Sequence, residues 1–178
     1  MSPLIVAGKG SRYAVSSLAF VSMAMDLPIG LTLLEPTSNI DWDRYFDLRW
    51  RVLRAPWQQP KGSEKDDRET DSIHLMLCDA SRTPLAVGRL HLNSPQEAQI
   101  RFMAVDPSVT GQGLGATVLK ALERRATGAS ARRIVLNARE QAIPFYQKHG
   151  YVVTEKAEIM FGSVLHARME KQIEATSA

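Results

Sequence analysis

The chain has 178 residues and carries 22 Lys and Arg against 19 Asp and Glu, a formal net charge of +3 at pH 7. At roughly 150 residues per domain, this length predicts one domain with an appendage and excludes two enzymatic domains. Hydrophobic residues make up 44% and charged residues 23%, which excludes collagen-like, disordered and coiled-coil chains. The single cysteine, Cys78, excludes an intramolecular disulfide and a Cys-rich zinc site, so packing must stabilise the fold.

Residues 1–28 are predicted to be an extension outside the fold. The uncharged run from Tyr13 to Met25 is shorter than the roughly 20 residues that span a bilayer, so we expect no membrane helix. Lys9 and Arg12, which precede the run, resemble the start of a weak signal peptide. We favour an unstructured extension, because the charged flank is sparse and serines interrupt the run. We therefore expect a cytoplasmic protein with no membrane partner.

The folded part begins with a predicted short strand at Gly30–Leu34 and a helix that starts near Asn39 and stops at Pro56. The helix is predicted from apolar residues that recur on one helical face: Trp42, Tyr45, Phe46, Trp50 and Leu53. The segment from Pro56 to Asp71 is polar and rich in Pro and Gly, which predicts a surface loop.

Three strands are predicted next, at Ile73–Cys78, Leu85–Leu92 and Gln99–Val105, and short turn segments between them indicate antiparallel pairing. Cys78 is expected to be a buried small hydrophobe. After these strands the spacing of apolar residues becomes that of a helix, with an apolar stripe formed by Leu114, Val118, Leu119 and Leu122. The helix is predicted to end at Gly128.

A short strand at Ile134–Asn137, a helix at Gln141–His149 and two strands at Tyr151–Phe161 and Val164–Lys171 complete the predicted fold. This order gives a mixed α/β (α+β) fold around one sheet. We place the domain at residues 29–172 and a tail at residues 173–178. The last two strands offer an edge through which a homodimer can pair.

A glycine-rich loop lies between the predicted strand Gln99–Val105 and the predicted helix that ends at Gly128. Gly111, Gly113 and Gly115 allow a tight turn that presents backbone amides beside the positive end of the helix dipole, a combination that binds phosphate. The loop is not a Walker loop, because Ala116 stands where that motif has lysine, and its glycine spacing differs from the dinucleotide fingerprint. A turn with no ligand is the alternative.

The segments Asp106–Gly115, Ile134–Arg139 and Ala142–Tyr151 together resemble the GNAT superfamily of acyl-CoA-dependent N-acyltransferases. Gly113 and Gly115 match its signature Q/R-x-x-G-x-G/A, whereas Thr110 replaces the leading Gln or Arg. The block from Phe145 to Tyr151 is similar to the FYxxxGF segment of the superfamily. The acidic residues Glu64, Asp66 and Asp67 before His74, and the stretch His166-Ala167-Arg168-Met169, resemble the small bacterial ElaA-like branch.

This resemblance implies a mostly antiparallel central sheet flanked by helices. It also implies an N-acetyltransferase that moves an acetyl group from acetyl-CoA directly to a primary amine of a small molecule or peptide. A catalytically silent acyl-CoA-binding or regulatory module with the same fold is the alternative. A nucleotide-binding protein is disfavoured because the Walker lysine is missing.

The resemblance also implies roles for particular residues. Pyrophosphate is expected on the amides of Gly111, Gln112, Gly113, Leu114, Gly115 and Ala116. The strand end Met103, Ala104 and Val105 is expected to pair with pantetheine and to polarise the thioester carbonyl, and Asn137 to offer its side-chain amide. Tyr146 is expected to protonate the thiolate. Glu64 is our candidate base, with Asp66, Asp67, His74, His91 or a water chain as alternatives.

Basic residues of the long helix and beyond offer either a site for the CoA 3′-phosphate or a solvated surface: Lys120, Arg124, Arg125, Arg132 and Arg133. No aromatic residue is interleaved with them, so we expect no nucleic-acid partner. The four histidines lack metal-ligand spacing, and no metal is expected.

Overall fold

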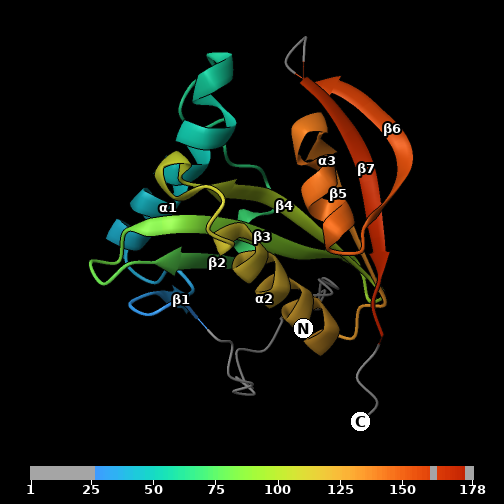
Figure 1. Ribbon diagram of the computed structural model, residues 1–178, viewed down its shortest axis with the longest axis horizontal. Coiled ribbons are helices and arrows are strands. Elements are labelled where there is room, and N and C mark those ends of the chain that lie inside the picture. Colours follow the sequence, from blue (N-terminus) through green and yellow to red (C-terminus); the bar gives the residue numbers. More distant parts are fainter. Residues whose placement is uncertain (1–26, 161–163, 175–178) are drawn as a thin grey trace, which may run out of the picture.

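The structure, a computed structural model, describes residues 27–160 and 164–174, so nearly all of the predicted extension lies outside the described residues. Within them it has seven strands and three α-helices (Figure 1). The strands are β1 Thr32–Leu34, β2 Ile73–Cys78, β3 Pro84–Ser94, β4 Glu97–Val105, β5 Arg133–Arg139, β6 Val152–Met160 and β7 Val164–Gln172. The α-helices are α1 Asn39–Leu53, α2 Leu114–Gly128 and α3 Ile143–Lys148, and short 3-10 turns include η1 Ala55–Trp57 and η2 Glu69–Asp71.

The strands form one sheet in the order β1-β2-β3-β4-β5-β7-β6, which confirms the predicted mixed fold with mostly antiparallel pairing. The one parallel contact joins β4 to β5, and it holds only where both strands begin, between Glu97–Gln99 and Arg133–Val135. Beyond these residues the two strands separate. Figure 1 shows β5, β7 and β6 turning away from the β1–β4 half of the sheet.

A β-bulge interrupts β4 where it separates from β5. Arg101 pairs with Arg89 and Ala104 pairs with Val87, so β4 carries one extra residue here. Phe102 takes up this residue with a φ of 56°, a left-handed conformation that is uncommon outside glycine. Gly88 faces the bulge, and a Cβ on it would lie 2.5 Å from the Met103 sulfur. A side chain at position 88 would therefore displace Met103 and the α2 side chains Leu122 and Val118 that pack against this glycine.

Helices cover both faces of the β1–β4 half of the sheet. The predicted stripe on α2 is buried against alternate residues of β2 such as Leu75 and Leu77. The intervening residues Met76 and Cys78 pack on the other face against Tyr45 and Leu48 of α1. The prediction that Cys78 is buried is thus confirmed. The apolar residues Leu27 and Ile173, at the two ends of the described chain, also pack on the α2 side.

The segment that follows η1 corrects the prediction of a simple surface loop. Arg49 of α1 and Arg89 of β3 have fully buried side chains, and Glu69 binds both of them with contacts of 2.9 Å. Asp66 adds a second ion pair to Arg89 and one of 3.0 Å to Arg101. Charged residues in a loop are usually solvated, but here each acid neutralises a buried guanidinium. We call these five residues the buried ionic cluster.

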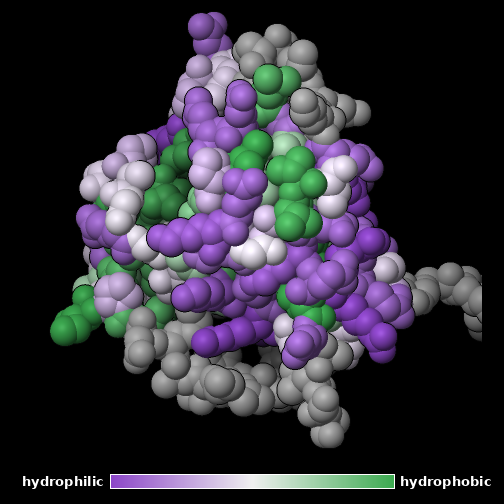
Figure 2. Space-filling model, turned by 45° about the vertical axis from the view of Figure 1, so that its right-hand side comes forward, coloured by the Kyte–Doolittle hydropathy of each residue, from purple (hydrophilic) through white to green (hydrophobic). Residues whose placement is uncertain are grey.

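β6 and β7 carry scattered exposed apolar residues. Val152, Val153 and Leu165 are exposed, and Figure 2, which turns this side forward, shows separate hydrophobic groups among hydrophilic ones. β6 is an edge of the sheet. Across residues 27–160 and 164–174, no helix is long and apolar enough to cross a membrane.

Candidate active site

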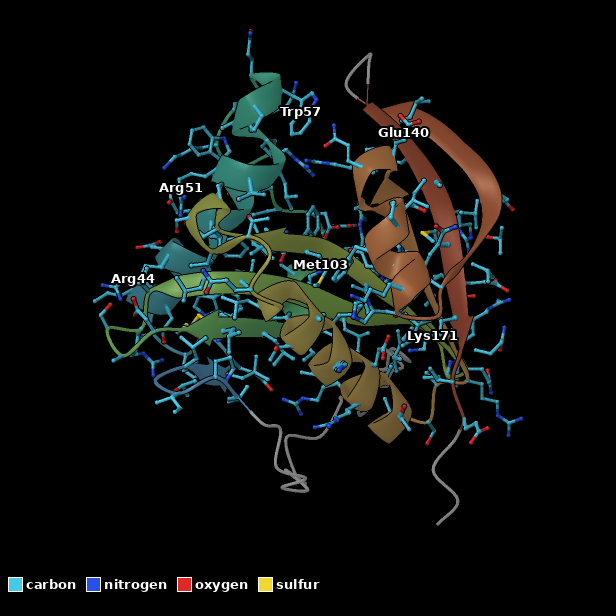
Figure 3. All side chains as sticks on the ribbon, in the orientation of Figure 1. Arg44, Arg51, Trp57, Met103, Glu140 and Lys171 are labelled. Carbon is cyan, nitrogen blue, oxygen red and sulfur yellow. The ribbon has the colours of Figure 1, made fainter. Side chains whose placement is uncertain are left out.

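A cavity of about 130 Å³ lies where β4 and β5 separate. It brings together three of the predicted site residues: Met103 from β4, Asn137 from β5 and Tyr146 from α3. Figure 3 places Met103 at the centre of the molecule, between the β1–β4 half of the sheet and α3. The rest of the lining is Leu53, Arg54, Ile100, Arg101, Phe102, Leu136, Ala138, Arg139, Ala142 and His166.

Tyr146 is the one phenol on this cavity among the lining residues, and it is only 7% exposed. Its ring packs edge-to-face against Phe145 and Tyr151, with centroids 5.0 and 5.7 Å away. Burial raises the pKa of the Tyr146 phenol well above its ordinary value, so the hydroxyl keeps its proton at neutral pH. A buried, protonated phenol beside an open space is able to donate a proton to a group that enters it.

The start of α2 packs on the end of β4 and on α3, two elements that also contribute to this cavity. Gly113 is the N-cap with a φ of 80°, and no side chain caps the first turn. A Cβ on Gly115 would lie 3.1 Å from Val105 at the end of β4 and 3.7 Å from the Phe145 ring. The first turn therefore packs closely on β4 and α3 while its amides point away from the helix. Such a helix end attracts anions.

The remaining predicted residues lie in different places. Ala104 is buried and Val105 partly buried at the end of β4. Glu64 has a nearly buried side chain that accepts a hydrogen bond of 2.7 Å from the Gly62 amide. It lines a second cavity, of about 650 Å³, between α1 and residues 61–65. The structure therefore does not bring Glu64 into the cavity of Tyr146.

Two of the alternative base candidates, Asp66 and His74, have other contacts. Asp66 belongs to the buried ionic cluster, and His74 Nε2 lies 2.8 Å from the carbonyl oxygen of Glu69. Burial lowers the pKa of His74, and burial together with Arg89 lowers that of His91 to about 4. Both histidines are therefore neutral at pH 7.

The family follows from a direct comparison with known proteins. The sequence model of the acetyltransferase (GNAT) family matches residues 42–151, from α1 through the glycine loop to the residue before β6. The chain belongs to the GNAT acetyltransferase family. This confirms both the predicted resemblance and the predicted enzyme class, a GNAT-type N-acyltransferase.

Individual GNAT proteins agree with this assignment. The uncharacterised N-acetyltransferase YjcF of Bacillus subtilis is 32% identical over 126 residues, which cover 71% of this chain and 89% of YjcF. Escherichia coli ElaA superposes with a TM-score of 0.65 at 18% identity, covering 79% of this chain and 97% of ElaA. A GNAT acetyltransferase from Elizabethkingia anophelis, solved with acetyl-CoA bound, superposes with a TM-score of 0.66 at 16% identity, covering 82% of this chain and 100% of that chain. The two structures show that the fold is shared.

The sequence did not indicate the basic residues of this GNAT cavity. Arg54, Arg101 and Arg139 line it together with His166. Arg139 donates a hydrogen bond of 2.7 Å to the carbonyl of Leu53, and its guanidinium lies 4.0 Å from the Trp57 ring. Burial, and then the like charge of Arg54, lower the pKa of Arg139 to about 10. The available signal was weak: Arg139 follows Asn137 by two positions and so shares its face of the strand.

The basic residues that we considered for the CoA 3′-phosphate do not form one group. Arg125 pairs with Glu35, and Arg133 pairs with Glu97. Arg132 and Arg133 follow the C-terminal end of α2, and a helix of 15 residues is about 22 Å long. They are therefore remote from the amides at its start.

Proposed function

We propose that this GNAT protein transfers an acetyl group from acetyl-CoA directly to a primary amine of its acceptor. The observation that carries the proposal is Tyr146, whose buried and protonated phenol lines the cavity between β4 and β5. The first turn of α2 contacts the same two elements, β4 and α3, that flank this cavity. An anion site and a proton donor thus lie within one region.

The donor fits the backbone of β4 and the start of α2. The amides from Gly111 to Ala116 bind the pyrophosphate of acetyl-CoA, and they need no leading Gln or Arg for this, so Thr110 is tolerated. Pairing of β4 with β5 ends at Gln99. The edge at Met103 to Val105 therefore receives pantetheine in place of a strand, and one of its N–H groups polarises the thioester carbonyl. Asn137 offers its side-chain amide from the opposite strand.

The reaction needs a neutral amine and a leaving thiolate that is protonated. The amine nitrogen attacks the thioester carbonyl, a C–N bond forms, and the C–S bond breaks. Tyr146 gives its proton to the departing thiolate and regains one from solvent. Because Glu64 lines the second cavity, we assign removal of the amine proton to water.

Release of the CoA thiol from acetyl-CoA over a panel of primary amines tests this proposal. Tyr146→Phe keeps the ring and deletes the proton, so kcat should fall by about 10²-fold while acetyl-CoA affinity stays the same. Tyr151→Phe is the matched control: it removes the same atom from a buried neighbour that does not line the cavity, and kcat should stay within about twofold.

Two results would contradict the proposal. Turnover of Tyr146→Phe within about twofold of the wild type would make Tyr146 a packing residue. Binding of acetyl-CoA without release of thiol for any amine would favour the silent acyl-CoA-binding module. The homodimer and the cytoplasmic location expected from the sequence stay predictions.

A further inference from the structure

The cavity between β4 and β5 is lined from both faces of the sheet. Leu136 and Ala138 of β5 pack with Tyr146 in the core on the α2 side. Arg139, the next residue along β5, points to the other side, because it donates a hydrogen bond of 2.7 Å to the carbonyl of Leu53 at the end of α1. A substrate in the cavity therefore meets the proton donor Tyr146 on one face and a second set of side chains on the other.

His166 belongs to the set on the α1 side. It lies on β7 directly opposite Arg139 of β5 in the antiparallel register, and residues that are directly opposite share a face of the sheet. Figure 1 shows β7 running beside β5 in the half of the sheet that turns away from β1–β4. His166 lines the cavity and is partly exposed, so its ring can exchange a proton with solvent.

The reaction has to remove a proton from the amine nitrogen, and few of the described lining residues are able to take it up. Arg54, Arg101 and Arg139 stay protonated. Tyr146 keeps its proton because burial raises the pKa of its phenol. His166 is the remaining titratable side chain among the described lining residues, and imidazole is the side chain that gains and loses a proton near neutral pH.

The position of β7 predicts a water molecule between the imidazole and the amine. β7 is the second strand from β4, because β5 lies between them. Neighbouring strands are about 4.8 Å apart, so the backbone of His166 lies roughly 10 Å or more from the edge of β4 that receives pantetheine. His166 and Met103 nevertheless line one cavity of only about 130 Å³, so a single water is enough to join the imidazole to the amine.

We propose that His166 accepts the proton that water removes from the amine. The inference rests on the proposed function and names the group that completes its proton transfer. When the C–N bond forms, the amine nitrogen gives a proton to the bridging water, and this water gives one of its protons to a ring nitrogen of His166. The imidazolium returns the proton to solvent after the products leave. Tyr146 protonates the thiolate from the other face, so the proton donor and the proton acceptor are kept apart.

Other contacts of His166 are compatible with this role. An imidazole has two ring nitrogens, so a neighbour that binds one of them leaves the second for water. A hydrogen bond at one nitrogen also fixes the tautomer and the orientation of the ring. The role therefore depends on the side of the ring that faces the cavity.

Release of the CoA thiol at saturating acetyl-CoA, with an amine that the wild type turns over, tests this role. His166→Gln keeps a group that hydrogen-bonds the bridging water but that does not take up its proton. It should lower kcat by about 10²-fold and change KM for acetyl-CoA by less than about twofold. A raised KM with an unchanged kcat would make His166 a binding residue and would overturn the inference.

His149→Gln is the matched control. His149 is also partly exposed, but it caps the C-terminal end of α3, where its Nδ1 lies 2.8 Å from the carbonyl oxygen of Phe145, and it is not among the lining residues of the cavity. The control removes the same imidazole and should leave kcat within about twofold of the wild type. Turnover of His166→Gln within that limit, or an equal loss of kcat in both variants, would contradict the proposal.

Chemical rescue separates proton transfer from structure. His166→Ala leaves space for a free imidazole, so added imidazole should raise its kcat by about tenfold and should not change that of His149→Ala. A loss of kcat that imidazole does not restore would make His166 a structural residue. Melting temperatures show which variants are folded, and if His166→Ala is unfolded, the kcat of His166→Gln decides.

The same assay distinguishes a failure of this inference from a failure of the proposed function. If the wild type releases no thiol with any amine, the proposed function fails and the inference fails with it. If Tyr146→Phe loses activity as expected while His166→Gln does not, only the inference fails, and water passes the amine proton directly to solvent.

Discussion

Replacing Glu69 by Gln should destabilise the protein far more than its position in a polar loop indicates. The carboxylate accepts hydrogen bonds of 2.9 Å from both terminal nitrogens of Arg49 and another of 2.9 Å from Arg89. Both guanidinium groups are fully buried. Removing one partner of a buried ion pair costs about 3–5 kcal/mol, because the remaining charge stays out of water without compensation.

The lower end of that range applies here, since Arg89 keeps its pair with Asp66. A loss of about 3 kcal/mol in a domain of this size lowers Tm by roughly 6–12 °C. Urea unfolding followed by circular dichroism measures the free energy of unfolding directly, and the m-value should not change.

Asp47→Asn is the matched control for Glu69→Gln. Asp47 also bridges two cations, Arg51 at 2.8 Å and Lys61 at 3.1 Å, but its side chain is 41% exposed. Such exposed pairs contribute at most about 1 kcal/mol. If the two variants lose equal stability, or if Glu69→Gln stays within about 1 kcal/mol of the wild type, burial does not strengthen the cluster and the reasoning is refuted.

Two further predictions concern the loop and acid pH. Gly115→Val should weaken acetyl-CoA binding at least tenfold, measured by calorimetry, because its Cβ would lie 3.1 Å from Val105. Gly128→Val is the control and should leave the affinity unchanged, because a Cβ there has nothing within 4 Å. Equal affinities of the two variants would contradict the prediction. His91 has a folded pKa of about 4, below its ordinary 6.5, so the unfolded state binds the proton first and stability should fall by about 3 kcal/mol between pH 6.5 and 4. In His91→Gln, the free energy of unfolding from urea titrations should change much less between pH 6.5 and 4. If it falls as steeply as in the wild type, His91 is not the cause of the pH dependence.

Local periodicity predicted most of the elements well. The strand Ile73–Cys78 has the limits that were expected from its apolar residues, and Leu114, Val118, Leu119 and Leu122 form the expected buried stripe. These features depend on neighbours in sequence, so a single chain contains them. The placement of β7 between β5 and β6 depends on pairing of remote segments, for which the local pattern has no signal.

The polar residues were harder to predict than the apolar ones. Arg49 looks like a solvent-facing residue of α1, yet its side chain is fully buried because Glu69, twenty positions away, compensates its charge. Burial of an arginine is decided by such a partner and not by its own polarity. The cavity shows the same difference. Tyr146 lies in a recognisable motif and could be predicted, whereas Arg54, Arg101 and Arg139 come from three separate elements and only the fold brings them together.

Phe102 connects the buried ionic cluster to the cavity. Its ring lies 3.8 Å from the guanidinium of Arg49, 4.9 Å from those of Arg89 and Arg101, and 5.5 Å from that of Arg54. A left-handed residue costs on the order of 1–3 kcal/mol, and cation–π contacts of about 0.5–2 kcal/mol each are sufficient to offset that cost. The bulge turns this ring among the arginines and also marks the place where β4 leaves β5. Glu69 binds Arg49 and Arg89, and both of these guanidinium groups lie against the Phe102 ring, so Glu69→Gln should loosen the bulge as well as lower stability.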